Sequence, residues 1–397
     1  MDLAARITQV KPSPTLSLDA KTKALQADGV DVVNFGAGEP DFSTPDYIKQ
    51  AGIRAIEDNF TRYTPVGGIP ELKKAIVDKF KRDNELDYSP DQIAVSCGGK
   101  HTLYNLAQVL FQAGDQVVVP APYWVSYPPI ITLAGAEPVI VATSETNDFK
   151  MTADELRAAV TPRTRAMILN SPSNPTGATY TRAELEALAE VVLERNLLVI
   201  SDDIYEKILF DGLSFRNMAN LGPELKERTV IAHGLAKTYA MTGWRIGFMA
   251  GGKEIAGAVT KLQSQSTSNP CSIAQKAGVA ALNGPDDSVA VMCAAFDERR
   301  LFLIEALNRI EGVKCFRATG AFYVFPNFSA HFGKRFGDLV IDGSDRMADY
   351  LLEEARVSVV PGQAFGEDAC LRLSYAISLD DIKKGLDRIE EALSRLS

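Results

Sequence analysis

The stretch GLAKTYAMTGWRIGF, residues 234–248, carries the most information in this chain. An apolar run at residues 230–232 leads into it, and a second run at residues 246–250 follows, so both runs are expected to be buried strands. Lys237 and Arg245 then lie where strands of one sheet end or begin. Because α/β folds bind ligands at such places, this lysine and this arginine are candidates for a binding site.

Lys237 and Arg245 suit the two ends of one ligand. A lysine amine with a lowered pKa can form a Schiff base with a carbonyl group. An arginine can hold a phosphate. Pyridoxal phosphate (PLP) carries an aldehyde at one end and a phosphate at the other. Since Tyr239, Met241 and Trp244 surround the lysine, which is not a surface composition, the stretch indicates a PLP site rather than a solvated lysine.

The composition is that of an ordinary globular protein. At 397 residues the chain is long enough for two or three domains. Its net charge of −9 argues against nucleic acid or an anionic membrane as the main partner. The first thirty residues hold no signal-peptide core, and no apolar stretch reaches membrane-spanning length. Five scattered cysteines and three scattered histidines fit no metal site and no disulfide framework, so we expect no metal and a cytoplasmic location.

Helices and strands are expected to alternate over most of the chain. Apolar runs predict strands at residues 93–96, 116–119, 138–141, 166–170, 197–201 and 230–232. Helical spacing predicts helices at residues 46–59, 70–81, 101–112, 153–160 and 182–195. Buried strands separated by helices predict an α/β fold, with a mostly parallel mixed sheet covered by helices. This large domain, the expected PLP-binding domain, is assigned to residues 47–299.

A smaller α+β domain is expected from the two ends of the chain. A long helix at residues 286–310 ends the alternating pattern. Beyond it, strands are predicted at residues 320–325, 357–360 and 371–375, and helices at residues 344–354 and 379–395. The N-terminal segment, residues 1–46, holds a predicted helix at 18–28 and a strand at 32–35. We assign residues 300–397 to the small domain and count residues 1–46 as part of it.

Three further sites suit the charges of PLP and an amino acid. Gly98, Gly99 and Lys100 stand between a strand and a helix, where free N–H groups and the helix dipole can cradle the phosphate that Arg245 also binds. Asp202 ends a buried strand and needs a partner, which the pyridine nitrogen of PLP offers. Arg372 alternates with leucines in a predicted strand, where its guanidinium can grip an α-carboxylate with two hydrogen bonds.

These motifs resemble, in order, those of the fold-type I PLP aminotransferases of the aspartate aminotransferase family. The resemblance runs from residue 36 to the C-terminus and is nearest to the gamma subgroup, which holds aspartate aminotransferases and relatives that also use prephenate. The family often has hydroxyl residues shortly before its lysine, where this chain has Gly234 and Ala236. Beside the lysine stretch, the matching strings are GAGEPDF at 36–42, PYW at 122–124, NSPSNPTG at 170–177, SDDIY at 201–205 and LRLSYA at 371–376.

The resemblance implies roles toward the cofactor for four more residues. Asn174 and Tyr205 are expected to hydrogen-bond its phenolic oxygen, and Trp124 to stack on its ring. Tyr63 is expected to reach the phosphate of a neighbouring subunit, which implies a homodimer with shared active sites. Asp203, where many relatives have glutamate, is read as a surface charge or a strand cap. By analogy with relatives, the peptide bonds expected to be cis are Ala121–Pro122 and Asn174–Pro175.

The substrate is expected to meet residues from several motifs. A second carboxylate on the substrate needs a cation, and Lys100 is the expected one. Its backbone serves the phosphate, which leaves its side chain free. The prephenate-using members of the subgroup pair this lysine with a threonine, which matches Thr15. The remaining residues expected to contact the substrate are Gly38, Trp124, Asn174 and Arg372, with Lys11 as a further candidate.

The resulting hypothesis is PLP-dependent ping-pong transamination. Lys237 is expected to move the Cα proton as general base and acid, with Asp202 and Tyr205 supporting the ring. The expected substrates are aspartate or glutamate with 2-oxoglutarate or oxaloacetate, and prephenate is a further candidate. Three alternatives stay open: an aminotransferase for alanine or aromatic amino acids, a PLP-dependent C–S lyase on the same fold, and a PLP-sensing transcription regulator, which needs an added DNA-binding domain.

Overall fold

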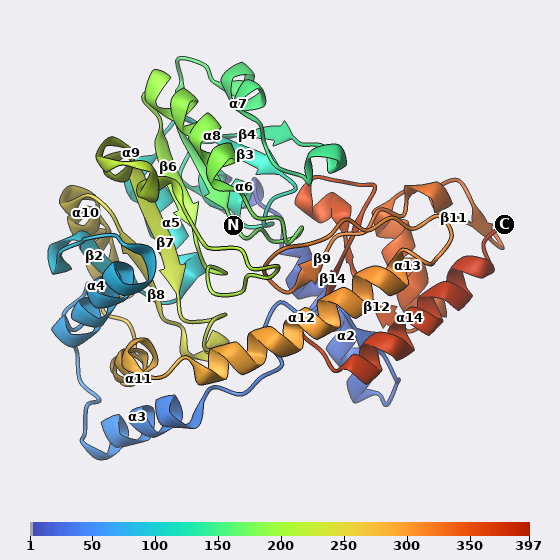
Figure 1. Cartoon of the computed structure of the whole chain (residues 1–397), viewed down its shortest axis with the longest axis horizontal. Coiled ribbons are helices and arrows are strands. Elements are labelled where there is room, and N and C mark those ends of the chain that lie inside the picture. The colour runs from blue at the N-terminus through green and yellow to red at the C-terminus, as the bar shows by residue number, and fades with distance from the viewer. Residues whose placement is uncertain (1–2) are drawn as a thin grey trace.

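The computed structural model describes residues 3–397 and is built around one seven-stranded sheet (Figure 1). The strand order is β2-β8-β7-β6-β5-β3-β4. The pairs β3–β4, β3–β5, β5–β6 and β6–β7 are parallel, whereas β8 runs antiparallel to both of its neighbours. The strands are β2 Ile93–Ser96, β3 Gln116–Ala121, β4 Glu137–Ala142, β5 Thr164–Asn170, β6 Leu198–Asp202, β7 Thr229–Gly234 and β8 Gly247–Ala250. The predicted mostly parallel, mixed sheet is therefore confirmed.

Helices cover both faces of this sheet because its strands are apolar on both sides. In β3, Val117 and Val119 pack in one cluster with α5, α6 and α10, while Val118 packs on the opposite face with α7 and α8. Helices α4 and α11 cover the end of the sheet that holds β2 and β8. The covering helices are α4 Pro70–Asn84, α5 Gly99–Leu110, α6 Tyr127–Leu133, α7 Ala153–Ala159, α8 Arg182–Glu194, α10 Lys253–Ser264 and α11 Ser272–Asn283.

A second unit joins the two ends of the chain. Strand β1 (Val33–Asn34) pairs in parallel with β12 (Val357–Ser358), and β14 (Leu371–Ser374) lies between β13 (Val360–Pro361) and β9 (Tyr323–Val324). Figure 1 shows α12 running from the large sheet toward this unit. The helices and short strands of this part are α1 Ala5–Thr8, α2 Pro14–Ala27, α12 Asp287–Leu307, β10 Arg335–Phe336, β11 Leu339–Val340, α13 Ser344–Glu354 and α14 Leu379–Ser394.

Most predicted elements are present, with shifts at their ends. The strand expected at 320–325 shortens to β9, because Ala321 has a φ of 58° that interrupts extended backbone. The strand expected at 357–360 is two strands, β12 and β13, which pair with different partners. The sequence analysis did not place α6, α10, α11 or the short α9 (Pro223–Arg228). Of these, α11 packs against α3.

Two local expectations concern the backbone near the predicted site. The bonds Ala121–Pro122 and Asn174–Pro175 are both cis, as expected, and Ser171–Pro172 is a third cis bond.

Helix α3 (Asp46–Glu57) follows the N-terminal segment and packs on α11. Over residues 3–397, none of the helices combines the length and the apolar character needed to span a bilayer.

Candidate active site

A cavity of about 470 Å³ lies at the carboxyl ends of β5, β6 and β7. Its walls come from the large sheet, from β14 of the second unit and from the N-terminal segment. It brings together most of the residues that the sequence analysis selected: Thr15, Gly38, Gly99, Lys100, Trp124, Asn174, Asp202, Tyr205, Lys237, Arg245 and Arg372. Residues far apart in the chain therefore form one site.

Lys237 follows the end of β7 and is held by the N-terminal segment. Its Nζ donates a hydrogen bond to the carbonyl oxygen of Gly38 and lies 5.7 Å from the centre of the Phe322 ring. Burial lowers the pKa of Lys237 to about 8, with a carboxylate at Glu39 acting in the opposite direction. A lysine with this pKa is unprotonated in a useful fraction near neutral pH, so it can act as a nucleophile and as a base.

Arg245 reaches the start of α5 because Gly98 leaves room for it, and Gly247 lets β8 approach the same turn. Gly98 has a φ of +95°, and a Cβ there would lie 2.4 Å from Nη2 of Arg245. A Cβ on Gly247 would lie 2.4 Å from the carbonyl carbon of Gly98. Arg245 also donates from Nη1 to the carbonyl of Thr242 at 2.9 Å. The guanidinium and the N-terminus of a 12-residue helix thus share one place, which is suited to a phosphate.

Asp202 is a buried carboxylate whose partners are uncharged. Tyr127 donates its hydroxyl to Oδ2 at 2.7 Å, and the backbone N–H of Ile204 lies 3.4 Å from Oδ1. Burial raises the pKa of Asp202, and the hydrogen bond from Tyr127 partly opposes that shift. A buried carboxylate in this state gains stability from a positive donor, and a protonated ring nitrogen is such a donor.

Arg372 is 2% exposed and also has uncharged partners. Its Nη1 donates to Oδ1 of Asn174 at 3.0 Å, and its Nη2 donates to the carbonyl of Gly36 at 2.9 Å. Its Nε is buried without a partner among the described residues. The guanidinium lies over the ring of Tyr323 at 4.5 Å. A buried arginine with an unused donor, at the wall of a cavity, is suited to binding a carboxylate.

Lys100 and Thr15 lie on the walls of the same cavity. The ammonium group of Lys100 is 5.1 Å from the centre of the Trp124 ring. Burial, followed by the positive charge of Arg245, lowers the pKa of Lys100. Thr15 is in the first turn of α2, and its hydroxyl pairs with that of Ser13 at 3.0 Å. The two side chains that were expected to meet a second carboxylate are thus both at the cavity.

Comparison with known proteins settles the family. The sequence profile of the family described as "Aminotransferase class I and II" matches residues 30–389. The chain is 47% identical, over 397 residues, to the probable aspartate/prephenate aminotransferase of Rickettsia felis, covering 100% of this chain and 97% of that protein. It is 49% identical to the aspartate aminotransferase of Geobacillus stearothermophilus, with 98% of both chains covered. The chain belongs to the class I and II aminotransferases.

Solved structures agree with this family. The aspartate aminotransferase of Rhizobium meliloti is 44% identical, with a TM-score of 0.96 and full coverage of both chains. The aspartate aminotransferase of Thermus thermophilus with maleate is 40% identical, with a TM-score of 0.93 and coverage of 99% of this chain and 100% of that one. The predicted fold, enzyme class and cofactor are therefore confirmed: the chain is a PLP-dependent aminotransferase.

The cavity of this aminotransferase fits PLP. The glycines beside Arg245 leave an anion site at one end, and the uncharged partners of Asp202 leave its carboxylate available at the other. Lys237 lines the same cavity and has a lowered pKa. Both ends and the reactive centre of the cofactor thus meet groups of the required charge.

Two expected site residues lie elsewhere. Lys11 is exposed and does not line the cavity. Tyr63 is 91% exposed and is also outside the cavity of its own chain. Tyr63 was expected to act in the site of a neighbouring subunit, so its position does not contradict the prediction. Lys11 was expected to act in the site of its own chain, and the structure does not bring it there.

Asp203 differs from the expectation that it is a surface charge or a strand cap. It is 1% exposed and accepts hydrogen bonds from Oγ of Ser201 and Nδ2 of Asn217, both at 2.6 Å. Burial raises its pKa far above the ordinary value. Asp203 directly follows the last residue of β6, and its partner Asn217 comes from a loop 14 residues further along the chain, so no local pattern shows that the carboxylate is buried.

A buried polar network behind the cavity was not expected. Lys79 of α4 forms an ion pair with Glu206, and Asn84 donates to Oε2 of Glu206 at 2.9 Å. Nε2 of His233, at the end of β7, is 3.3 Å from Oε1 of Glu206. Tyr127, the partner of Asp202, was also missed, although it stands only three residues after Trp124.

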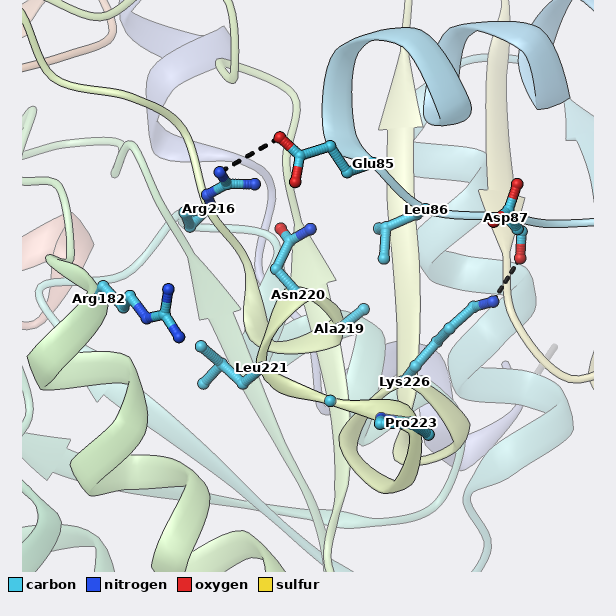
Figure 2. A pocket seen from close by; sticks show the side chains of 11 residues that line it. Glu85, Leu86, Asp87, Arg182, Arg216, Ala219, Asn220, Leu221, Pro223 and Lys226 are labelled. Atoms are coloured by element: carbon cyan, nitrogen blue, oxygen red, sulfur yellow. Dashed lines mark hydrogen bonds and ion pairs between the residues drawn. The ribbon is translucent and has the colours of Figure 1, made fainter.

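A second hollow of about 370 Å³ lies between α8, α9 and the end of α4 (Figure 2). Its charged side chains already have partners. Arg216 is 3.4 Å from Glu85, and Lys226 donates to the backbone carbonyl of Asp87. Arg182 donates to Glu186 at 2.7 Å. The two arginines of this hollow thus have glutamate partners, and Lys226 contacts a backbone carbonyl.

Proposed function

We propose that this aminotransferase acts on dicarboxylic substrates, transferring the amino group of aspartate or glutamate to 2-oxoglutarate or oxaloacetate. The observation that carries the proposal is the presence of two cations, Arg372 and Lys100, on the walls of one cavity with Lys237. Arg372 suits the α-carboxylate, and Lys100 suits the second carboxylate. Maleate, named with the Thermus thermophilus structure, is itself a dicarboxylate, which supports this choice.

The residues proposed to hold PLP surround the cavity. Arg245 and the backbone of Gly98, Gly99 and Lys100 would hold the phosphate. Trp124 would cover the ring, and Asp202 would face its nitrogen. Asn174 and Tyr205 would donate to its phenolic oxygen. When bound, the cofactor supplies an aldehyde and a ring that accepts electrons from the carbon bearing the amino group.

The chain's own groups would bind the substrate and move one proton. Arg372 would orient the α-carboxylate, and its contact with Asn174 fixes the plane of the guanidinium. Gly38 would approach the substrate from the N-terminal segment. The Nζ of Lys237, with a pKa of about 8, would take the Cα proton and return it to the cofactor carbon. The carboxylate of Asp202 would keep the ring nitrogen protonated.

Prephenate is the further substrate that we propose. It is a 2-oxo acid with a second carboxylate, so the pairing of Arg372 with Lys100 suits it too. Thr15 lies on the wall of the cavity, where it can meet the larger substrate. The name of the Rickettsia felis relative, which includes prephenate, supports this extension.

We also propose a homodimer in the cytoplasm. Tyr63 is an aromatic side chain that is 91% exposed in the single chain, which suits a contact with a partner subunit. In such a dimer it would reach the phosphate in the partner's site. The five cysteines are free thiols, which suits a reducing compartment.

A substrate screen of the purified, PLP-loaded protein tests the proposed function. The amino donors are aspartate, glutamate, alanine, phenylalanine and cysteine, each with 2-oxoglutarate or with prephenate as acceptor. We expect the highest kcat/KM with aspartate or glutamate. Faster transfer from alanine or phenylalanine contradicts the dicarboxylic preference, and release of thiol and pyruvate without a keto acid indicates a lyase.

A further inference from the structure

The loop at residues 36–44 lies along the turn that carries Lys237 and Arg245. The two segments are more than 190 residues apart in the chain but are joined by a row of hydrogen bonds. These are Lys237 Nζ to the Gly38 carbonyl, Thr242 Oγ1 to Glu39 Oε2 at 2.6 Å, Thr44 Oγ1 to the Ala240 carbonyl at 2.6 Å, and Trp244 Nε1 to Thr44 Oγ1 at 3.1 Å. The loop thus contacts the turn along its length.

Glu39 is the charged member of this row. Its carboxylate lines the cavity and is fixed there by the hydroxyl of Thr242. The carbonyl of the same threonine accepts the hydrogen bond of Arg245 at 2.9 Å. Glu39 also follows Gly38, whose carbonyl holds Lys237. Glu39 is therefore linked through Thr242 to the arginine of the phosphate site, and its neighbour Gly38 holds the reactive lysine.

The charges around Lys237 make a further carboxylate useful. Arg372, from β14, and Arg245, from the turn, both destabilise the positive form of the lysine. Asp202, from the end of β6, and Glu39 stabilise it, and Glu39 has the larger effect of the two. Glu39 also stabilises the positive charge of Lys23, on α2 at the cavity wall. Without Glu39, one carboxylate fewer would offset the repulsion between Lys237 and the two arginines.

We propose that Glu39 is a positioning residue for transamination, which fixes the loop at 36–44 on the lysine-bearing turn and keeps a negative charge beside Lys237. The inference rests on the proposed function, because it assumes that Lys237 carries the cofactor. It assigns a role to a residue for which the sequence analysis gave none. The negative charge of Glu39 keeps the link between Lys237 and the cofactor protonated up to a higher pH. The hydrogen bond from Thr242 fixes the position of the Glu39 carboxylate.

The test uses the PLP-loaded enzyme without substrate. The lysine-linked cofactor absorbs visible light, and its absorption changes when the link loses its proton, so a spectroscopic pH titration reports the midpoint. Glu39→Gln keeps the shape of the side chain and its acceptor oxygen for Thr242 but removes the charge. A cation that loses a negative neighbour releases its proton at lower pH, and we expect the midpoint to fall by about half a pH unit, a modest shift because Glu39 is exposed.

Asp41→Asn is the matched control, since Asp41 lies in the same loop, pairs with Arg299 and does not line the cavity. Its midpoint should equal that of the unchanged enzyme. Thr242→Val removes the anchor but keeps the charge, so its midpoint should fall by less than that of Glu39→Gln. An unchanged or raised midpoint in Glu39→Gln overturns the inference, even if the substrate screen supports a dicarboxylic aminotransferase. Failure of that screen leaves the titration readable, so the two results are separable.

Discussion

Two buried sets of charges lie side by side in this protein and differ in their partners. In the cavity, Asp202 and Arg372 contact only uncharged groups, and Arg372 keeps one donor unused within residues 3–397. Behind the cavity, Lys79 and Glu206 pair with each other and share Asn84. The paired set completes the fold, whereas the set with uncharged partners retains charge for a ligand. Substitutions in the first set should change chemistry, and substitutions in the second should change stability.

The largest effect is expected at Lys237. Lys237→Ala removes the group that links the cofactor and moves the proton, so turnover should fall by about 10⁴-fold or more. The visible absorption band of the lysine-linked cofactor should disappear. Because the lysine is in the cavity and has no ion pair within residues 3–397, the thermal unfolding midpoint of the cofactor-free protein should not fall. A variant that keeps both the band and the turnover contradicts the assignment.

Asp202→Asn should give the next largest loss. The ring nitrogen would lose the carboxylate that keeps it protonated, and kcat should fall on the order of 10³-fold. The amide can still accept the hydrogen bond from Tyr127, so the protein should fold. The measurement is the rate of a single half-reaction with aspartate. Near-normal turnover would show that Asp202 does not serve the ring.

Lys79→Met tests the other side of the comparison. It leaves Glu206 buried without its cation, and breaking such a pair costs about 3–5 kcal/mol of stability. Urea unfolding of the cofactor-free protein measures that loss. Lys81→Met, on the same helix but with an exposed side chain, is the control and should cost little. A catalytic defect in Lys79→Met without a loss of stability would break the distinction between the two sets.

Lys100→Ala should give the smallest and most selective effect. Losing a charge-assisted hydrogen bond to the second carboxylate should cost about 2–3 kcal/mol in kcat/KM for aspartate and glutamate. The loss should appear mainly in KM, and alanine should be affected much less because it has no second carboxylate. Steady-state kinetics with both donors provides the comparison. Equal losses for all donors would show that Lys100 serves the cofactor or the fold.

The sequence identified most of the reactive residues of the cavity but not the network behind it. Asp202 is the last residue of β6, and Lys237 and Asn174 stand in the loops after β7 and β5, where short local strings reveal both the position and the chemistry. Lys79 lies in a helix that is otherwise rich in exposed charges, and its partner Glu206 comes from a distant loop. Such a pair exists only after the chain is packed, so no local pattern indicates it. The same reason explains why Tyr127 and the burial of Asp203 were missed.

The link between Lys237 and the cofactor is the central claim, and one measurement tests it directly. The PLP-loaded protein is reduced with borohydride, which makes the bond between cofactor and lysine permanent, then digested and analysed by mass spectrometry. The account predicts a single modified peptide with the cofactor on Lys237, and no such label on Lys100 or Lys23, the other lysines that line the cavity. A cofactor attached at Lys100, or the absence of any lysine-linked cofactor, would contradict the account.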